Sequence, residues 1–427
     1  MKSFILKGDI AYSISKERTE YLENAYLVCE DGVSKGVFRS LPEEYAHLPL
    51  SDRTGKLIIP GLVDLHIHAP QFAYRGLGMD MELLDWLNAY AFPEEAKYND
   101  LAYAERAYTI FSQAMKNCAT TRACVFSTLH KDATVLLMEQ LEYSGIVSYV
   151  GKVNMDRESP ESYKEASAEE SLKSTREWIE ETKGRFENTY PIITPRFVPS
   201  CTGELLKGLS ELSEEYALPV QSHLSENPSE VELVRTLEPL CPFYGAVYEK
   251  YALFGGDKKT VMAHCVYSSD EEIRLMKQNG VYIAHCPASN MNVSSGIAPV
   301  RKYLDADLHI GLGSDVAGGQ TESLFSTIVE AVQNSKLYWR VVDQKYPPLR
   351  FEEAFYLATK GGGSFFGKVG SFEEGYEFDA LVFDDSRIRH PQKLSLPERL
   401  ERLVYLGGDR RCMKEKYVRG TQIDLDE

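Results

Sequence analysis

The fold follows from one stretch of sequence, Pro60-Gly61-Leu62-Val63-Asp64-Leu65-His66-Ile67-His68. From Leu62 onward it is a short apolar run, which is typical of a strand in a buried parallel sheet. It ends in two histidines, His66 and His68, and residues two apart in a strand point to the same side. We therefore expect a buried strand that presents two imidazoles at its carboxyl end.

Downstream of this stretch, to about residue 370, apolar strands alternate with amphipathic helices, which is the pattern of a parallel α/β sheet. The pattern predicts eight strands, at Leu62–His68, Thr120–Ser127, Ile146–Val153, Pro191–Phe197, Pro219–His223, Thr260–His264, Val281–His285 and His309–Gly313. Helices are expected at Ser171–Lys183, Glu204–Tyr216 and Asp270–Asn279, among others. Eight such units fit a closed TIM-like (β/α)8 barrel better than an open sheet.

The two ends of the chain have β character instead. Short strands are predicted at Ser3–Leu6, Tyr26–Glu30, Gly36–Arg39, Asp379–Phe383 and Arg402–Leu406. The simplest arrangement packs both ends into one small β-sandwich domain beside the barrel. This predicts three segments, with residues 1–61 and 373–427 forming the sandwich and residues 62–372 forming the barrel.

The composition of the chain limits the classes of partner that it can bind. The chain has 427 residues and a formal net charge of −17, which argues against a nucleic acid or an anionic membrane as partner because phosphate binding needs basic surface. The amino terminus lacks the apolar length of a signal peptide, and no apolar run approaches the roughly 20 residues of a transmembrane helix. We expect a cytoplasmic protein that acts on a small molecule.

Polar residues gather at the predicted carboxyl ends of the barrel strands, where barrel enzymes carry out their chemistry. These are His66, His68, His223, His264 and Asp315. Imidazoles with a carboxylate suit Zn²⁺, with Fe²⁺ as the second choice. Taken singly, the two histidines of the first strand could be satisfied core residues and Asp315 a turn or cap residue. Their shared position at one rim favours the metal site.

A metal site of this kind predicts a hydrolytic mechanism. A bound zinc ion makes hydroxide available from water at neutral pH, and Asp315 is placed to take the proton. Glu226, three residues after His223, suits a proton shuttle to a ring nitrogen and then to a leaving amine, although it could also be a surface residue that starts a helix. His264 is expected to orient the attacking oxygen. We expect a structural role for His285 and a peripheral one for His130.

Longer motifs resemble the amidohydrolase superfamily and, within it, the guanine deaminases. The first-strand motif resembles that of the superfamily. The motifs similar to guanine deaminases are Ala69-Pro70-Gln71, Leu83–Leu87, Phe92-Pro93-Glu94, Val150–Val153, Pro195-Arg196-Phe197, Ser222–Asn227, Met262-Ala263-His264, Ala284–Pro287 and Gly311–Gly319. The resemblance covers about residues 57 to 340.

This resemblance implies hydrolytic deamination of guanine to xanthine, with guanine and water as substrates. It implies one zinc ion per subunit, held by His66, His68, His223 and Asp315, with Glu226 as proton shuttle. It also implies that guanine is contacted by Gln71, Arg196, Phe197, His223 and Glu226. A glutamine amide can donate and accept at a purine edge, an arginine can hold the O6 carbonyl, and a phenylalanine can stack on the ring. Family members are commonly homodimers.

Related enzymes and a non-enzyme are the competing interpretations. Two-metal members of the superfamily place a bridging lysine at the end of the fourth strand, where this chain has Arg196-Phe197, so Lys152 is interpreted as support for the pocket. A sister hydrolase acting on cytosine, an s-triazine or 8-oxoguanine is the nearest alternative. A binding or scaffold barrel that has lost its metal would lack ligands, and none is missing here.

Overall fold

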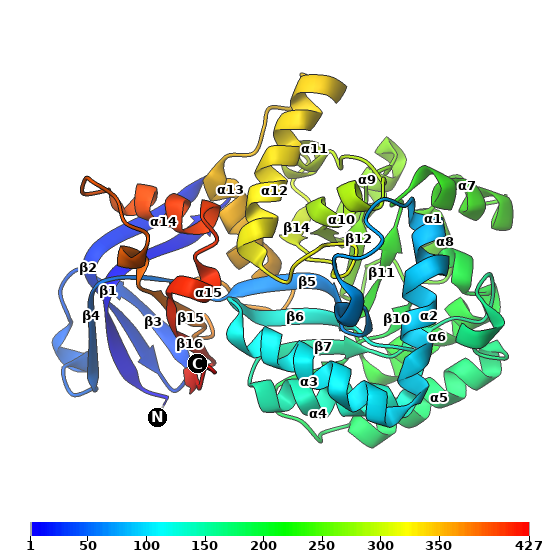
Figure 1. Ribbon diagram of the computed structural model, residues 1–427, viewed down its shortest axis with the longest axis horizontal. Coiled ribbons are helices and arrows are strands. Elements are labelled where there is room, and N and C mark those ends of the chain that lie inside the picture. The colour runs from blue at the N-terminus through cyan, green and yellow to red at the C-terminus, as the bar shows by residue number, and fades with distance from the viewer. Residues whose placement is uncertain (1, 427) are drawn as a thin grey trace.

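The structure is a computed structural model that describes residues 2–426. Figure 1 shows two parts, a barrel of strands surrounded by helices and a smaller sheet at its side. The beginning and the end of the chain both lie in the smaller sheet (Figure 1). The two terminal regions therefore meet in space, as the β character of both ends predicted.

The barrel sheet has eight strands, all paired in parallel. In pairing order they are β11 (Val220–Leu224), β12 (Thr260–His264), β13 (Tyr282–His285), β14 (His309–Leu312), β5 (Leu62–His68), β6 (Thr120–Phe126), β7 (Val147–Gly151) and β9 (Thr189–Pro191). A bridge between Ile193 and Val220 joins the segment after β9 to β11 and closes the sheet. The predicted (β/α)8 barrel is confirmed. Strand β5 has the predicted bounds, and all its residues are buried.

Helices surround this sheet (Figure 1). They include α3 (Leu101–Asn117), α4 (Lys131–Ser144), α5 (Ala168–Thr182), α6 (Gly203–Tyr216), α8 (Gly245–Lys250), α9 (Asp270–Asn279), α11 (Val300–Asp305), α12 (Leu324–Leu337) and α13 (Phe351–Tyr356). Four more helices lie in the segments that follow β5, β11 and β13, namely α1 (Leu83–Trp86), α2 (Phe92–Ala96), α7 (Pro228–Leu237) and α10 (Pro287–Asn292). Within residues 2–426, none of the helices combines the length and apolar content needed to cross a bilayer.

The fourth barrel strand differs from its prediction at 191–197. The structure has β9 and then a two-residue strand β10 (Thr194–Pro195), which pairs with β8 (Val153–Asn154). Pro191 and Pro195 have no N–H to donate, so the ladder is interrupted there. Arg196 and Phe197 consequently lie beyond the strand, at the rim of the barrel.

The two chain ends form one sheet of seven strands. Its order is β17 (Thr421–Ile423), β16 (Met413–Val418), β15 (Ala380–Phe383), β4 (Leu50–Pro60), β1 (Phe4–Ser15), β2 (Arg18–Glu30) and β3 (Val33–Phe38). The predicted β-sandwich thus takes the form of a single hydrogen-bonded sheet with its own apolar cluster, which includes Phe4, Leu27, Phe372 and Phe378.

The strand predicted at Arg402–Leu406 is wrong, because this segment lies at the end of helix α14 (Leu396–Tyr405). Ser395 and Glu398 form a capping box at the start of that helix. Leu396, Leu400, Leu403 and Val404 are buried along one face. This spacing of three to four residues is helical, and it outweighs the β propensity of the short run Leu-Val-Tyr-Leu.

Among other contacts, a buried ion pair and a close chain crossing join the terminal sheet to the barrel. Arg122 of β6 forms a bidentate ion pair with Asp379 beside β15, with Nε–Oδ2 and Nη2–Oδ1 distances of 2.5 and 2.9 Å. The chain passes from β4 into β5 through Gly61, where a Cβ atom would lie 2.1 Å from Oγ1 of Thr121. Only glycine allows this close approach.

Candidate active site

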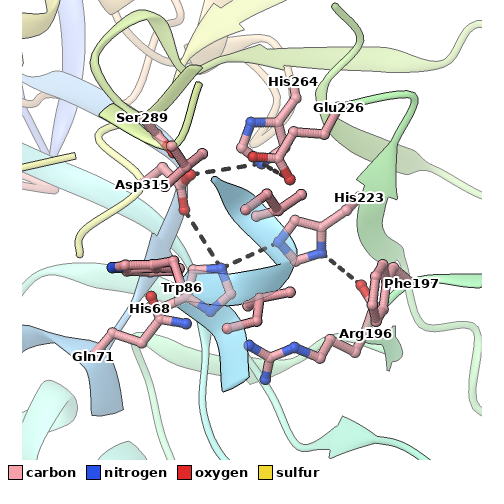
Figure 2. A pocket seen from close by; sticks show the side chains of 13 residues that line it. His68, Gln71, Trp86, Arg196, Phe197, His223, Glu226, His264, Ser289 and Asp315 are labelled. Atoms are coloured by element: carbon pink, nitrogen blue, oxygen red, sulfur yellow. Dashed lines mark hydrogen bonds and ion pairs between the residues drawn. The ribbon is translucent and has the colours of Figure 1, made fainter. Parts of the chain in front are cut away.

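The candidate site lies where the carboxyl ends of the barrel strands meet. His66 and His68 are carried by β5, His223 by β11 and His264 by β12, and Asp315 follows the end of β14. Figure 2 shows His68, His223, His264 and Asp315 pointing toward one another. The structure therefore brings together the side chains that were expected to meet at this rim.

The nitrogen and oxygen atoms of these side chains lie within contact distance of one another. Nε2 of His68 lies 3.2 Å from Nε2 of His66 and 3.2 Å from Nε2 of His223. Oδ1 of Asp315 lies 3.1 Å from Nε2 of His66 and 3.5 Å from Nε2 of His68. All four side chains are buried. They form one compact donor set at the carboxyl end of the barrel, and His68, His223 and Asp315 also line the pocket beside it.

The protonation of this donor set suits a metal ion. Burial and the neighbouring imidazoles lower the pKa of His68 and of His223 well below the ordinary value, so both rings are neutral. Burial opposes ionisation of Asp315, but the adjacent His66 and His264 hold its pKa well below the usual range. Neutral imidazole and ionised carboxylate are the forms that bind metals.

Hydrogen bonding alone does not account for the arrangement. Each contact between two Nε2 atoms can hold only one proton, and Nε2 of His68 faces both other rings, so the three imidazoles cannot all satisfy one another. The buried atom Nδ1 of His68 has no hydrogen-bond partner either. A central cation would satisfy the facing lone pairs. His66, His68 and Asp315 form a group that could hold a metal ion, as do His66, His223 and His264.

Neighbouring groups fix the orientation of these side chains. Nδ1 of His223 lies 2.5 Å from the carbonyl oxygen of Arg196, so this nitrogen carries the proton and Nε2 faces the site. Asp64, which shares the inward face of β5 with His66, accepts hydrogen bonds from the backbone N–H groups of His66 and Ser314 at 3.1 and 3.0 Å. Sequence reasoning missed this bracing role of Asp64.

His264 lies beside the donor set and faces two carboxyl groups. Its Nε2 atom is 3.6 Å from Oδ2 of Asp315 and 3.5 Å from Oε2 of Glu226. Its Nδ1 atom lies 2.9 Å from Oδ1 of Asn290 on α10. Asn290 is a second residue that sequence reasoning missed, because it lies within a helix that no strand pattern predicts.

Glu226 is buried just before α7, with its carboxyl group facing the pocket (Figure 2). Burial raises its pKa well above the ordinary value, and the negative charges of Glu230 and Asp315 raise it further. Glu230 also accepts a hydrogen bond from the backbone N–H of Glu226 at 2.9 Å. A carboxyl group whose pKa is raised toward neutrality can both give and take a proton.

The pocket beside these groups has polar and apolar walls (Figure 2). The expected substrate-contacting residues Gln71, Arg196 and Phe197 line it. The remaining wall comes mainly from residues to which sequence reasoning gave no role, namely Leu83, Trp86, Leu87, Ser289 and Val293. The run Leu83–Leu87 after the first strand was the available signal for the apolar part. A pocket with an aromatic wall and a few polar groups suits a heteroaromatic ring.

Three residues with expected minor roles lie outside the pocket lining. His285 is buried at the end of β13, and burial together with the charge of His264 lowers its pKa to about 4. His130 stands at the start of α4, with its ring 6.0 Å from that of Tyr163. Lys152 is buried and bonds to Oε1 of Glu165 at 2.5 Å.

Comparisons with known proteins agree on one family. The profile of the amidohydrolase family matches residues 57–414. A guanine deaminase of Dictyostelium discoideum is 37% identical over 98% of this chain and 98% of its own. The guanine deaminase of Homo sapiens is 40% identical over 86% of this chain and 83% of its own.

Solved structures give the same result. A guanine deaminase from C. acetobutylicum, with guanine bound in its active site, superposes with a TM-score of 0.95 at 49% identity and covers 99% of this chain and 100% of its own. E. coli guanine deaminase superposes with a TM-score of 0.87 at 30% identity, over 99% of this chain and 100% of its own. The family match spans well over half of the sequence. The chain therefore belongs to the amidohydrolase family.

Proposed function

We propose that this protein is a metal-dependent guanine deaminase that converts guanine and water into xanthine and ammonia. One observation carries the proposal: a buried His/Asp donor set and the proton-holding Glu226 face the same pocket, whose wall offers Gln71 and Arg196. Donor set, proton carrier and polar wall are the three parts that hydrolysis of an amino-heterocycle needs. The relatives named above support guanine as the substrate.

His66, His68, His223 and Asp315 would hold one Zn²⁺ per subunit, with Fe²⁺ as the alternative metal. Imidazole nitrogens and a carboxylate oxygen are both ligand types that Zn²⁺ takes in proteins. When bound, the ion would supply Lewis-acid chemistry that makes water nucleophilic at neutral pH.

The protein's own groups then handle the protons. Asp315 accepts a proton from the attacking water, whose oxygen forms a bond to C2 of guanine. Glu226 gives its proton to a ring nitrogen as the ring C=N bond opens. It then takes the proton of the new hydroxyl group and passes it to the amino group, which leaves as ammonia when its bond to C2 breaks and the carbonyl forms. The proton held by Asp315 finally returns to Glu226. His264, at 3.5 Å from Glu226 and 3.6 Å from Asp315, lies between the two carboxyl groups and orients the attacking oxygen.

Guanine would be held by the wall of the pocket. Arg196 donates to the O6 carbonyl, and the amide of Gln71 pairs with the purine edge. Phe197, whose ring is 6.5 Å from that of His223, stacks against the purine. His223 and Glu226 contact the reacting end of the ring.

The test is turnover of guanine by zinc-loaded protein, followed by loss of guanine absorbance and release of ammonia. Glu226→Gln is assayed beside the wild type, with zinc content measured in both. Turnover that falls at least about a thousandfold in the variant while zinc stays bound would support the substrate and the shuttle role. Absence of turnover by the zinc-replete wild type would contradict guanine as substrate, and a panel of cytosine, s-triazines and 8-oxoguanine would follow.

A second proposal concerns assembly: the chain forms a homodimer through the end of α12 and the helical segment Tyr338–Val342 that follows it. Leu337, Val341 and Val342 are 48%, 70% and 59% exposed there, and apolar side chains grouped on a surface commonly mark an interface. Light scattering is expected to give twice the chain mass for the wild type and the single mass for Val341→Glu. A monomeric wild type would overturn this assignment.

A further inference from the structure

Glu95, on α2, is completely buried and lies outside the pocket lining. It nevertheless holds two side chains that do line the pocket. Its Oε1 atom accepts a hydrogen bond from Nε2 of Gln71 at 2.8 Å. Its two oxygens also accept from Nη1 and Nη2 of Arg196, at 2.5 and 3.0 Å. One carboxylate thus joins the two residues expected to recognise the purine.

The bond to Glu95 fixes which way the Gln71 amide faces. Nε2 donates to Glu95, while Oε1 accepts from the backbone N–H of Ala317 at 3.2 Å. An amide rotated by half a turn would place its oxygen against a carboxylate and its nitrogen against an N–H. In the wild type, the amide of Gln71 therefore has one defined orientation toward the pocket.

The same carboxylate fixes the plane of the Arg196 guanidinium and balances its positive charge. Two parallel N–H···O bonds hold the guanidinium in a fork, and the ring of Phe92 lies 4.9 Å from its carbon. Phe92 and Glu95 belong to the same short helix, so both of these contacts to the guanidinium come from α2. Because a guanidinium carries only donors, the N–H groups left over favour a carbonyl oxygen and disfavour an amino group.

We propose that Glu95 is the positioning residue that fixes Gln71 and Arg196 toward the substrate and so selects a purine with a 6-oxo group. This inference rests on the proposed function. Buried ion pairs often contribute little net stability, so the burial of the Glu95–Arg196 pair alone would not assign it a role in substrate binding. Here, however, Gln71 and Arg196, which both donate hydrogen bonds to Glu95, are residues of the pocket wall.

The variant Glu95→Gln keeps the shape of the side chain and removes its charge. Only one of its two terminal atoms is an acceptor, so the new N–H₂ group faces an N–H donor of Arg196 or Gln71, and the two side chains lose their fixed orientation. The KM for guanine is expected to rise about 10- to 100-fold, while kcat changes less than about threefold. With 2-aminopurine, which lacks the 6-oxo group, kcat/KM or the inhibition constant should change little. The preference for guanine over 2-aminopurine should therefore fall about 10-fold or more.

Asp379→Asn is the matched control. Asp379 also forms a buried bidentate pair with an arginine, Arg122, but at the junction with the terminal sheet. This control is expected to lower thermal stability and to leave the KM for guanine unchanged. Glu95→Asp, which keeps the charge on a shorter stem, is expected to give an intermediate KM, and it replaces Glu95→Gln if that variant does not fold.

The outcomes separate the inference from the proposed function. A wild type that does not deaminate guanine overturns the proposed function and the substrate selectivity with it. An active wild type whose KM and purine preference shift no more in the Glu95 variants than in Asp379→Asn overturns the positioning role alone. A loss confined to kcat, or to thermal stability, also overturns it.

Discussion

Asn290 accepts a hydrogen bond from His264, with 2.9 Å between Oδ1 and Nδ1. Both residues are buried, and the bond places the proton on Nδ1. The opposite nitrogen, Nε2, is thereby aimed at Glu226 and Asp315. The orientation of the imidazole between the two proposed proton carriers thus depends on a residue from α10.

Replacing Asn290 by leucine removes this acceptor while keeping a similar volume. The imidazole of His264 can then rotate or change tautomer, and groups that orient an active-site histidine typically contribute about 10- to 100-fold to activity. We expect kcat for guanine to fall by that amount with zinc content unchanged. Steady-state kinetics and metal analysis on the same sample measure both. An unchanged kcat would show that His264 needs no support from Asn290.

Asp64 gives a second prediction, on metal affinity. Its carboxylate accepts from Ser314 N–H, Ser314 Oγ–H and His66 N–H, which ties β5 to the segment that carries Asp315. Asp64→Asn would place an amide N–H₂ against one of these donors. We expect about 10- to 100-fold weaker zinc binding in competition with a chromogenic chelator, since residues behind the ligands tune affinity on this scale. Equal affinity in a folded variant would contradict the bracing role.

Lys416 gives a prediction on stability and pH. On β16, it donates to the carbonyl oxygens of Met115, Lys116 and Cys118 at the end of α3. Burial lowers its pKa to about 8, from an ordinary value of 10.5. Between these values the unfolded chain holds the proton and the folded protein does not, so this group makes stability rise with pH across the window.

Lys416→Met should remove that dependence. The free energy of unfolding of the wild type, minus that of the variant, is expected to grow by about 1 to 3 kcal/mol from pH 8 to pH 10. Subtracting the variant cancels other groups that titrate in the same range. Urea unfolding followed by circular dichroism at several pH values measures the difference. A difference that does not vary with pH would mean that Lys416 keeps its charge in the folded protein across this range.

The sequence predicted an element well where the signal for it lay in the element's own residues. The strand Leu62–His68 was predicted with its observed bounds, since a strand buried on both faces is an uninterrupted apolar run. The strand at 191–197 was displaced because two prolines break its ladder. Helix α14 was mistaken for a strand although Ser395 and Glu398 carried the capping signal. There the β propensity of a short run was given too much weight.

In the candidate site, the same distinction holds. The rule that parallel strands end at one rim was enough to place His66, His223 and Asp315 together. The supporting groups were not predictable in this way, because their contacts join segments that no pattern connects. Glu95 and Arg196 are 101 positions apart, and His264 and Asn290 are 26 apart on different elements. Hydrogen-bond partners of this kind follow only from the packed structure.

Trp86 provides the last prediction, on the apolar wall. It lies on α1 beside Gln71 and His68 in the pocket, and its ring packs 5.7 Å from that of Tyr74 (Figure 2). Trp86→Ala removes a large flat surface next to the substrate, so the KM for guanine and the inhibition constant of xanthine should rise together by about 10-fold or more. Because Trp86 forms no hydrogen bond to the proton carriers, kcat should change much less.

Trp86→Phe, which keeps an aromatic face, is the control and should retain most of the affinity. A variant in which kcat falls while both constants stay the same would show that Trp86 shapes the reaction step and not the binding of the ring.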